Sequence, residues 1–461
     1  MSWTTTTEAK TWEQQPAVQA GKPVNENEVD AVFHIHKEKK QQTIEGFGTC
    51  FNELGWTSLG LLKEDERDTI FSELFKPNSG ANFTICRMPV GCNDFSRNWY
   101  SYDETDKDFE LKDFSIANDK ETLIPFIHKA LNFNPELKIW ASPWCPPQWM
   151  KRNHHYACQV SGHMFPDQYK NDLKKKDEID EGEDAFIIDD EYFKCYSKYF
   201  GKFIDAYKAE GINIFAVMPQ NEFNSNQVFP SCVWKIESLN RFVGEYLGPE
   251  MKSRNVSVLF GTMERPFERY VDVILNDPKS SQYIEGIGFQ WAGKKCLPGI
   301  HRRYPNMKLW QTEQECGDGK NNWDGAVYSW NLMCHYLNHG VQAYMYWNTS
   351  LIEGGISRWG WAQNSLVVVD EKTKKYRYTP EYYVLKHVSH FVQKGATKVG
   401  ISRSIVDDDV SVKALSFVNP DGKVVIVCGN EAQYEQTVSF EVNQKYYTVT
   451  LPALSFNTLV L

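Results

Sequence analysis

The sequence has no long apolar run, because none of its hydrophobic stretches approaches the ~20 residues that a membrane-spanning helix needs. It also lacks an excess of positive charge: 50 Lys and Arg residues stand against 60 Asp and Glu residues, for a formal net charge of -10. This balance argues against a nucleic-acid backbone as the main partner. We therefore expect neither a membrane nor a nucleic-acid partner, and the sequence leaves the oligomeric state unknown.

Metal and disulfide signatures are missing as well. The eleven Cys residues are odd in number and scattered, with no CxxC pair and no spacing typical of metal ligands. The triplet His34–His36 has a spacing that can bind zinc, but alternating exposed positions on an edge strand explain it better. We interpret Asp407–Asp409 as a solvated turn. We expect no disulfide framework, no metal and no cofactor.

The first twenty residues are polar and lack the apolar core of a signal peptide. We expect a secreted or periplasmic protein whose signal peptide has been removed, with a cytoplasmic location as the alternative.

What the sequence does contain is a high share of aromatic residues, 14% in all, including 15 Trp. Most of these Trp side chains are expected in the core. Others can form flat stacking surfaces, and with a net negative charge these suit sugar rings better than nucleic-acid bases.

Eight short apolar runs alternate with amphipathic helical segments from residue 42 onward. Near-continuous apolar runs are typical of strands covered on both faces. The eight runs are Gln42–Cys50, Asn82–Gly91, Lys138–Trp144, Ile214–Glu222, Val256–Glu264, Ile284–Trp291, Met307–Glu315 and Ala343–Asn348. Eight strand–helix repeats predict an α/β protein with a (β/α)₈ barrel. A doubly wound sheet would need a glycine-rich phosphate turn, and Glu45–Gly48 supplies only a GxG.

The helices stop after Gly395, and short strands with alternating polar and apolar residues follow. We predict a polar N-terminal tail over 1–24, an N-terminal strand over 25–41, a barrel over 42–392, and an all-β sandwich over 393–461 that the N-terminal strand completes. The charged segment Lys151–Asp190 follows the third strand of the barrel, so it should lie on the active face and could wall the active site.

Barrel enzymes carry their chemistry at the carboxyl ends of the strands. The fourth strand ends in Gln220-Asn221-Glu222, and the seventh ends in Glu313 with Glu315 two residues on. Two facing carboxylates are what glycoside hydrolysis needs, one as acid and one as nucleophile. Other strand-end residues are candidates for sugar contacts: Arg87, Asp94, Trp144, Trp149, Gln290, Trp291 and Trp347.

An ordered set of motifs resembles glycoside hydrolase family 30, the group that includes lysosomal glucosylceramidase. The motifs are Glu45-Gly46-Phe47-Gly48, Arg87-Met88-Pro89, Cys92-Asn93-Asp94-Phe95-Ser96, Ala141-Ser142-Pro143-Trp144, Gln220-Asn221-Glu222 and Thr312-Glu313. The resemblance implies a retaining β-glycosidase with a carbohydrate substrate. It implies Glu222 as acid/base and Glu313 as nucleophile.

The resemblance also implies that Asn221 bonds the sugar 2-hydroxyl and that Arg87 steadies the nucleophile. Two residues depart from the family pattern: Phe223 stands where Pro is usual, and Gln290 where His or Tyr is frequent. The family acts on β-glucosides, β-xylosides, β-fucosides, β-galactosides and β-1,6-linked glucans. The alternatives are an endo-acting β-1,6-glucanase and an inactive carbohydrate-binding barrel.

Overall fold

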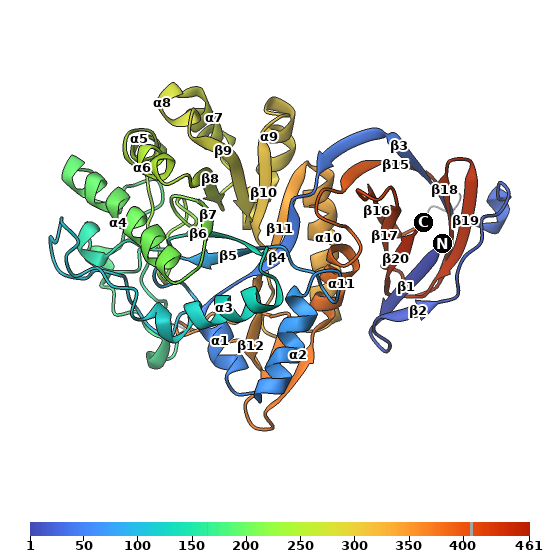
Figure 1. The fold of residues 1–461 in the computed structure, drawn as a ribbon, viewed down its shortest axis with the longest axis horizontal. Helices are drawn as coiled ribbons and strands as arrows, with labels where there is room; N and C mark the ends of the chain where they lie inside the picture. Colours follow the sequence, from blue (N-terminus) through green and yellow to red (C-terminus); the bar gives the residue numbers. More distant parts are fainter. Residues whose placement is uncertain (164, 406–408) are drawn as a thin grey trace.

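A computed structural model describes residues 1–163, 165–405 and 409–461 of the chain. Asp407 and Asp408 of the predicted turn therefore lie outside the described residues. The molecule has two parts, a barrel and a β domain (Figure 1). Within the described residues, no helix is both long and apolar enough to cross a membrane.

Eight parallel strands close into a barrel, which confirms the predicted architecture. They are β4 (Gly46–Cys50), β5 (Ile85–Pro89), β6 (Lys138–Ser142), β7 (Ile214–Val217), β8 (Ser257–Met263), β9 (Ile284–Gln290), β10 (Lys308–Glu313) and β11 (Val341–Asn348). Each lies within or overlaps one of the eight predicted runs. Their side chains are almost all buried, because strand neighbours and the helical layer cover both faces.

Helices surround the barrel strands (Figure 1). They are α1 (Glu53–Leu59), α2 (Glu64–Phe75), α3 (Leu123–Phe133), α4 (Asp190–Ala209), α5 (Ile236–Phe242), α6 (Gly248–Ser253), α7 (Glu268–Asn276), α8 (Pro278–Ser281), α9 (Leu297–Arg303), α10 (Trp323–Asn338) and α11 (Pro380–Ser389). Strands β12 (Ser350–Ile352), β13 (Val367–Asp370) and β14 (Lys375–Tyr378) form a small sheet after the eighth barrel strand. The loop between β12 and β13 returns to the end of β11, where Asn348 Nδ2 donates to Gln363 Oε1 at 3.0 Å.

Among the described residues, the β domain combines segments from both ends of the chain in one hydrogen-bonded series of nine strands. Its strands are β1 (Ser2–Thr7), β2 (Glu13–Gln15), β3 (Ala31–Thr43), β15 (Thr397–Ile405), β16 (Lys413–Val418), β17 (Val424–Asn430), β18 (Gln436–Val442), β19 (Lys445–Leu451) and β20 (Ser455–Val460). The predicted N-terminal strand is present as β3. It runs beside β15 from the barrel into the β domain (Figure 1).

Two details of this domain differ from the sequence prediction. Residues 1–24 are not simply a polar tail, because β1 pairs with β20 and β2. Its threonines favour strands although they are polar, since β-branched side chains fit a pleated surface. Strand β3, which carries His34 and His36, is not an edge strand. It lies between β18 and β15.

Candidate active site

Glu313 and Glu222 lie at the same end of the barrel. Glu313 is the last residue of β10, and Glu222 lies in the turn that follows β7. Their exposed fractions are only 4% and 5%. Glu222 has a φ of 47°, in the left-handed region that non-glycine residues rarely adopt, and such backbone strain is concentrated at functional sites.

The amide of Gln290 joins the two carboxylates. Its Nε2 donates to Glu222 Oε1 at 2.9 Å and to Glu313 Oε2 at 3.3 Å. Because both oxygens contact this one nitrogen, at 2.9 and 3.3 Å, they lie no more than about 6.2 Å apart. The same Nε2 also lies 3.1 Å from Asn221 Oδ1. The uncharged amide of Gln290 therefore links the two carboxylates through hydrogen bonds.

Arg87 on β5 forms a buried ion pair with Glu313. Its Nη1 donates to Glu313 Oε2 at 2.7 Å, and its Nη2 donates to Asn221 Oδ1 at 2.7 Å. The guanidinium also lies over the Trp144 ring, 4.3 Å from the centroid. A buried, planar cation with several donors fixes the positions of both neighbours at once.

The two carboxyl groups differ in what surrounds them. Burial raises the pKa of Glu222 well above its ordinary value, and the nearby charge of Glu313 raises it further. Burial also raises the pKa of Glu313, but the Arg87 charge and the hydrogen bond from Trp291 Nε1 oppose this effect. Glu313 is therefore the group that ionises first, and Glu222 is the group that keeps its proton.

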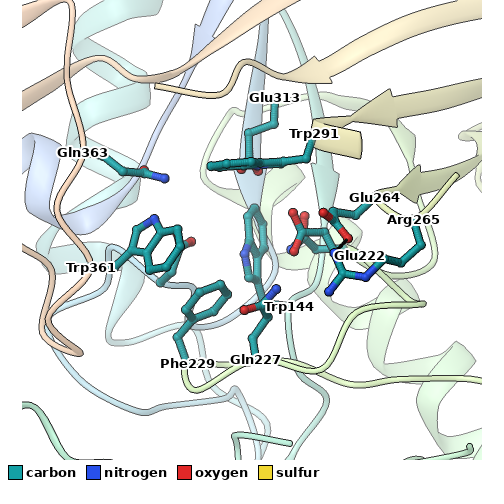
Figure 2. Close-up of a pocket in the computed structure, with 12 residues that line it drawn as sticks. Trp144, Glu222, Gln227, Phe229, Glu264, Arg265, Trp291, Glu313, Trp361 and Gln363 are labelled. Carbon is teal, nitrogen blue, oxygen red and sulfur yellow. Dashed lines mark hydrogen bonds and ion pairs between the residues drawn. The ribbon is translucent and has the colours of Figure 1, made fainter. Parts of the chain in front are cut away.

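A cavity opens over this pair (Figure 2). Its floor and walls combine carboxylates, amides and aromatic rings. The lining residues are Asp94, Trp144, Asn221, Glu222, Gln227, Phe229, Glu264, Arg265, Trp291, Glu313, Trp361 and Gln363. An acid pair in a cavity with flat rings can protonate and displace a leaving group from a bound sugar ring.

Comparison with known families agrees with this geometry. Residues 44–392 match the model of the glycosyl hydrolase family 30 TIM-barrel domain, and residues 395–459 match that of the family 30 beta sandwich domain. The chain belongs to glycoside hydrolase family 30. It is thus a β-glycoside hydrolase, as the sequence predicted, with a barrel and an appended β sandwich.

Two relatives of this family 30 hydrolase carry names of different activities. It is 28% identical to the lysosomal acid glucosylceramidase of Mus musculus over 86% of the chain and 77% of that protein. It is 24% identical to the endo-1,6-beta-D-glucanase neg1 of Aspergillus fumigatus over 97% of the chain and 90% of that protein. The fold matches the crystal structure of SrfJ from Salmonella typhimurium with a TM-score of 0.86, at 22% identity, covering 100% and 99% of the two chains.

Seven of the eight residues predicted to contact sugar fall into three groups in this hydrolase. Asp94, Trp144, Asn221 and Trp291 line the cavity. Arg87 and Gln290 are fully buried and bond the acid pair. Trp347 stacks against Trp144 with ring centroids 5.2 Å apart.

The prediction that Trp149 contacts the sugar is corrected by the structure, because this side chain lies away from the cavity. Its Nε1 donates to the carbonyl of Asp103 at 3.0 Å, and its ring packs against Phe109 and Tyr192. Glu315, the second carboxyl near the end of β10, also turns away. It bonds Lys294 and Tyr328. Of these two carboxyl groups, Glu313 is the one that lines the cavity.

The histidines predicted to have no metal role occupy ordinary hydrogen-bonding positions. His36 Nε2 lies 2.7 Å from Ser402 Oγ, and His34 Nδ1 lies 3.3 Å from Glu441 Oε2. Over residues 1–163, 165–405 and 409–461, no group of three His, Cys, Asp or Glu side chains could hold a metal ion. All eleven cysteines are buried free thiols.

Several residues that line the cavity were not predicted from the sequence. Glu264 and Arg265 follow the end of β8, and a search of every strand end would have found them. Gln227 and Phe229 lie in the long turn after Glu222. Trp361 lies in an irregular loop, where no periodic pattern marks a functional side chain.

The described residues of the segment 151–190 contact the loops that line the cavity. Asn171 Nδ2 donates to the Val228 carbonyl at 2.8 Å, and Lys151 Nζ donates to the Ser231 carbonyl at 2.7 Å. Glu181 pairs with Arg265. The segment thus fixes two of the loops from which the walls are built, and the cavity lining contains none of the described residues 151–163 and 165–190.

Proposed function

We propose that this family 30 hydrolase cleaves β-glucosides or related β-glycosides with retention of anomeric configuration. Glu313 is the nucleophile and Glu222 is the acid/base. The observation that carries this proposal is the contact of one Gln290 nitrogen with both carboxylates. Retaining glycosidases place their carboxyl groups about 5–5.5 Å apart, whereas inverting enzymes need about 6.5–9.5 Å. The shared contact keeps one oxygen of each carboxyl within about 6.2 Å of the other, which supports the closer spacing of a retaining pair.

In the first step, ionised Glu313 attacks the anomeric carbon and the bond from that carbon to the leaving oxygen breaks. Glu222 gives its proton to this oxygen, so the alcohol departs neutral. A glycosyl ester on Glu313 remains. Asn221, held by Arg87 and Gln290, lies beside the acid pair where it can bond the 2-hydroxyl of the sugar.

In the second step, the same surroundings reverse the role of Glu222. Once Glu313 is esterified, its negative charge is gone, and the electrostatic cause that raised the pKa of Glu222 disappears. Glu222 has already lost its proton and now accepts one from water. The water oxygen attacks the anomeric carbon, Glu313 leaves as a carboxylate, and the sugar departs with its original configuration.

The names of the relatives make glucose the first sugar to test. A panel of nitrophenyl β-glycosides, beginning with the glucoside and extending to the fucoside, xyloside and galactoside, measures release of nitrophenol. The wild type should cleave at least one of them. Glu313→Ala should lose on the order of 10³-fold or more in kcat, because the covalent nucleophile is gone.

Glu315→Gln is the matched control, since it removes a carboxylate two residues along the chain that bonds Lys294 and Tyr328. It should keep activity within a few-fold. Proton NMR of the first-formed sugar should show the β-anomer before mutarotation. An α-anomer contradicts the retaining mechanism. Binding of sugars without turnover of any glycoside or β-1,6-glucan would favour an inactive binding barrel instead.

A further inference from the structure

The cavity extends beyond the acid pair between two unlike walls (Figure 2). Trp361 and Phe229 lie on one side of it, and Glu264 and Arg265 lie on the other. The acid/base Glu222 lies on the charged side. The group that Glu222 protonates leaves from this part of the cavity, so the two walls face the leaving group.

The charged wall is rigidly built. Glu264 is only 7% exposed and forms an ion pair with Arg265. Arg265 also bonds both carboxylate oxygens of Glu181, from Nη2 at 2.7 Å and from Nε at 3.1 Å. The backbone nitrogen of Arg265 donates to Asn224 Oδ1 at 3.2 Å. Glu264 is buried, the Arg265 side chain keeps 33% of its surface exposed, and these contacts hold both charged groups at the cavity lining.

The opposite wall is aromatic and flat. Trp361 meets Trp291 and Phe229 edge to face, with ring centroids 6.4 and 6.2 Å away. The backbone nitrogen of Trp361 donates to Ser357 Oγ at 3.0 Å, which fixes the turn that carries it. Trp291 is fixed in turn by its hydrogen bond to Glu313. The leaving group therefore lies between fixed aromatic rings and a part-buried ion pair.

We infer that this space is a subsite for a sugar leaving group, so that the substrate is a β-linked oligosaccharide rather than a glycoside of a lipid. The inference rests on the proposed function, because it needs Glu222 as the group that protonates the leaving oxygen. A pyranose has C–H faces that stack on aromatic rings and hydroxyl edges that bond a carboxylate and a guanidinium. An alkyl chain in the same space would cover Glu264 and Arg265 without offering them a hydrogen bond, which costs their solvation.

The test compares three substrates with the same sugar at the cleaved bond: the glycosyl fluoride, a β-linked disaccharide and the octyl β-glycoside. Fluoride is too small to reach either wall, so its hydrolysis reports the acid pair alone. In the wild type, kcat/KM for the disaccharide should exceed that for the octyl glycoside by about tenfold or more, the effect of one or two hydrogen bonds.

Glu264→Leu replaces the carboxylate by an apolar side chain of similar size. The ratio of kcat/KM for the disaccharide to kcat/KM for the octyl glycoside should decrease by about tenfold or more. For Glu264→Gln, this ratio should lie between the values for Glu264→Leu and for the wild type. Glu237→Leu is the matched control, because Glu237 is an exposed carboxylate that pairs with Arg269 away from the cavity. It should leave the ratio unchanged.

The outcomes separate the two hypotheses. If the wild type does not hydrolyse the fluoride, the proposed function fails. If it hydrolyses the fluoride but prefers the octyl glycoside, the sugar subsite is wrong. A wild-type preference for the disaccharide that Glu264→Leu leaves intact also overturns the inference, with fluoride hydrolysis and the melting temperature showing that the variant is folded.

Discussion

Nη1 of Arg87 lies 2.7 Å from Oε2 of Glu313, and both side chains are almost completely buried. This ion pair is what distinguishes the two catalytic candidates electrostatically. Glu222 bonds the neutral amide of Gln290, whereas Glu313 bonds a cation. Two buried carboxyl groups with different neighbours are driven to opposite protonation states, which is the requirement for one acid and one nucleophile.

Replacing Arg87 should shift the acidic limb of the pH profile. Arg87→Met removes the charge that opposes the rise in the Glu313 pKa, so this pKa should increase. Glu313 must be ionised to attack, and the acidic limb of kcat/KM should therefore move to higher pH by about one unit or more. Arg87→Lys keeps a charge and should move it less.

The measurement is kcat/KM against pH for the wild type and both variants on one nitrophenyl glycoside. Breaking a buried pair also costs about 3–5 kcal/mol of unfolding free energy, so the folded fraction is measured alongside. If the acidic limb stays in place in the folded fraction of both variants, Arg87 does not set the ionisation of Glu313.

Gln290→Met should move both limbs of the profile together. The Gln290 amide donates to both carboxylates, and each of these hydrogen bonds lowers the pKa of its acceptor. Losing them should raise both values, so that Glu313 ionises later and Glu222 holds its proton longer. The pH optimum should rise by roughly half a unit to one unit. A shift in the acidic limb alone would mean that the Gln290 amide lowers the pKa of Glu313 but not that of Glu222.

Asp119 should make stability depend on pH. Three tyrosine hydroxyls, those of Tyr100, Tyr102 and Tyr207, donate to its carboxylate. Burial nevertheless raises the pKa of Asp119 to about 6, above its ordinary value of 3.8. The folded protein then holds more protons than the unfolded chain between these two pH values. The contribution of Asp119 to the free energy of unfolding is fully present below pH 3.8 and is lost as the pH rises through about 6.

Urea unfolding of the wild type and Asp119→Asn checks this dependence. The stability of the wild type relative to the variant should fall between about pH 4 and about pH 7, by on the order of 2–3 kcal/mol. The comparison between two proteins removes the effect of the other titrating groups. A constant difference over this range would mean that Asp119 ionises normally in the fold.

Lys151→Met should loosen the support of the cavity wall. The buried ammonium of Lys151 donates to the carbonyls of Tyr156 and Ser231, at 2.9 and 2.7 Å. Methionine fills the same space but leaves these carbonyls without their donor, at a cost of about 2 kcal/mol or more. The melting temperature should fall, whereas an exposed control such as Lys175→Met should leave it unchanged. Equal melting temperatures for the wild type and Lys151→Met would contradict the proposed role of Lys151.

The sequence could locate Glu222 and Glu313 because strand order along the chain determines position around a barrel. The same logic was not sufficient for Trp149. An aromatic residue after a strand can face the mouth or the helical layer, and the choice depends on Phe109 and Tyr192, which are remote in the sequence.

Strand β3 shows the same limit in the β domain. Its alternating pattern predicted a strand correctly but could not tell an edge from an interior position. The strands on its two sides, β15 and β18, come from the far end of the chain. Trp361 was missed for a related reason, because no local period marks a loop whose place is set by tertiary contacts.

The pairing of β1 with β20 has a consequence for the order of events during synthesis. Thr4 opposes Thr458, and β1 is made before β20, so β1 stays without this partner until β20 has left the ribosome. We expect the barrel to assemble while β1 stays unpaired, with sheet closure as a late step, because contacts this distant in sequence form slowly. A strand of consecutive threonines suits this delay, since an unpaired polar strand is less prone to aggregate than an apolar one.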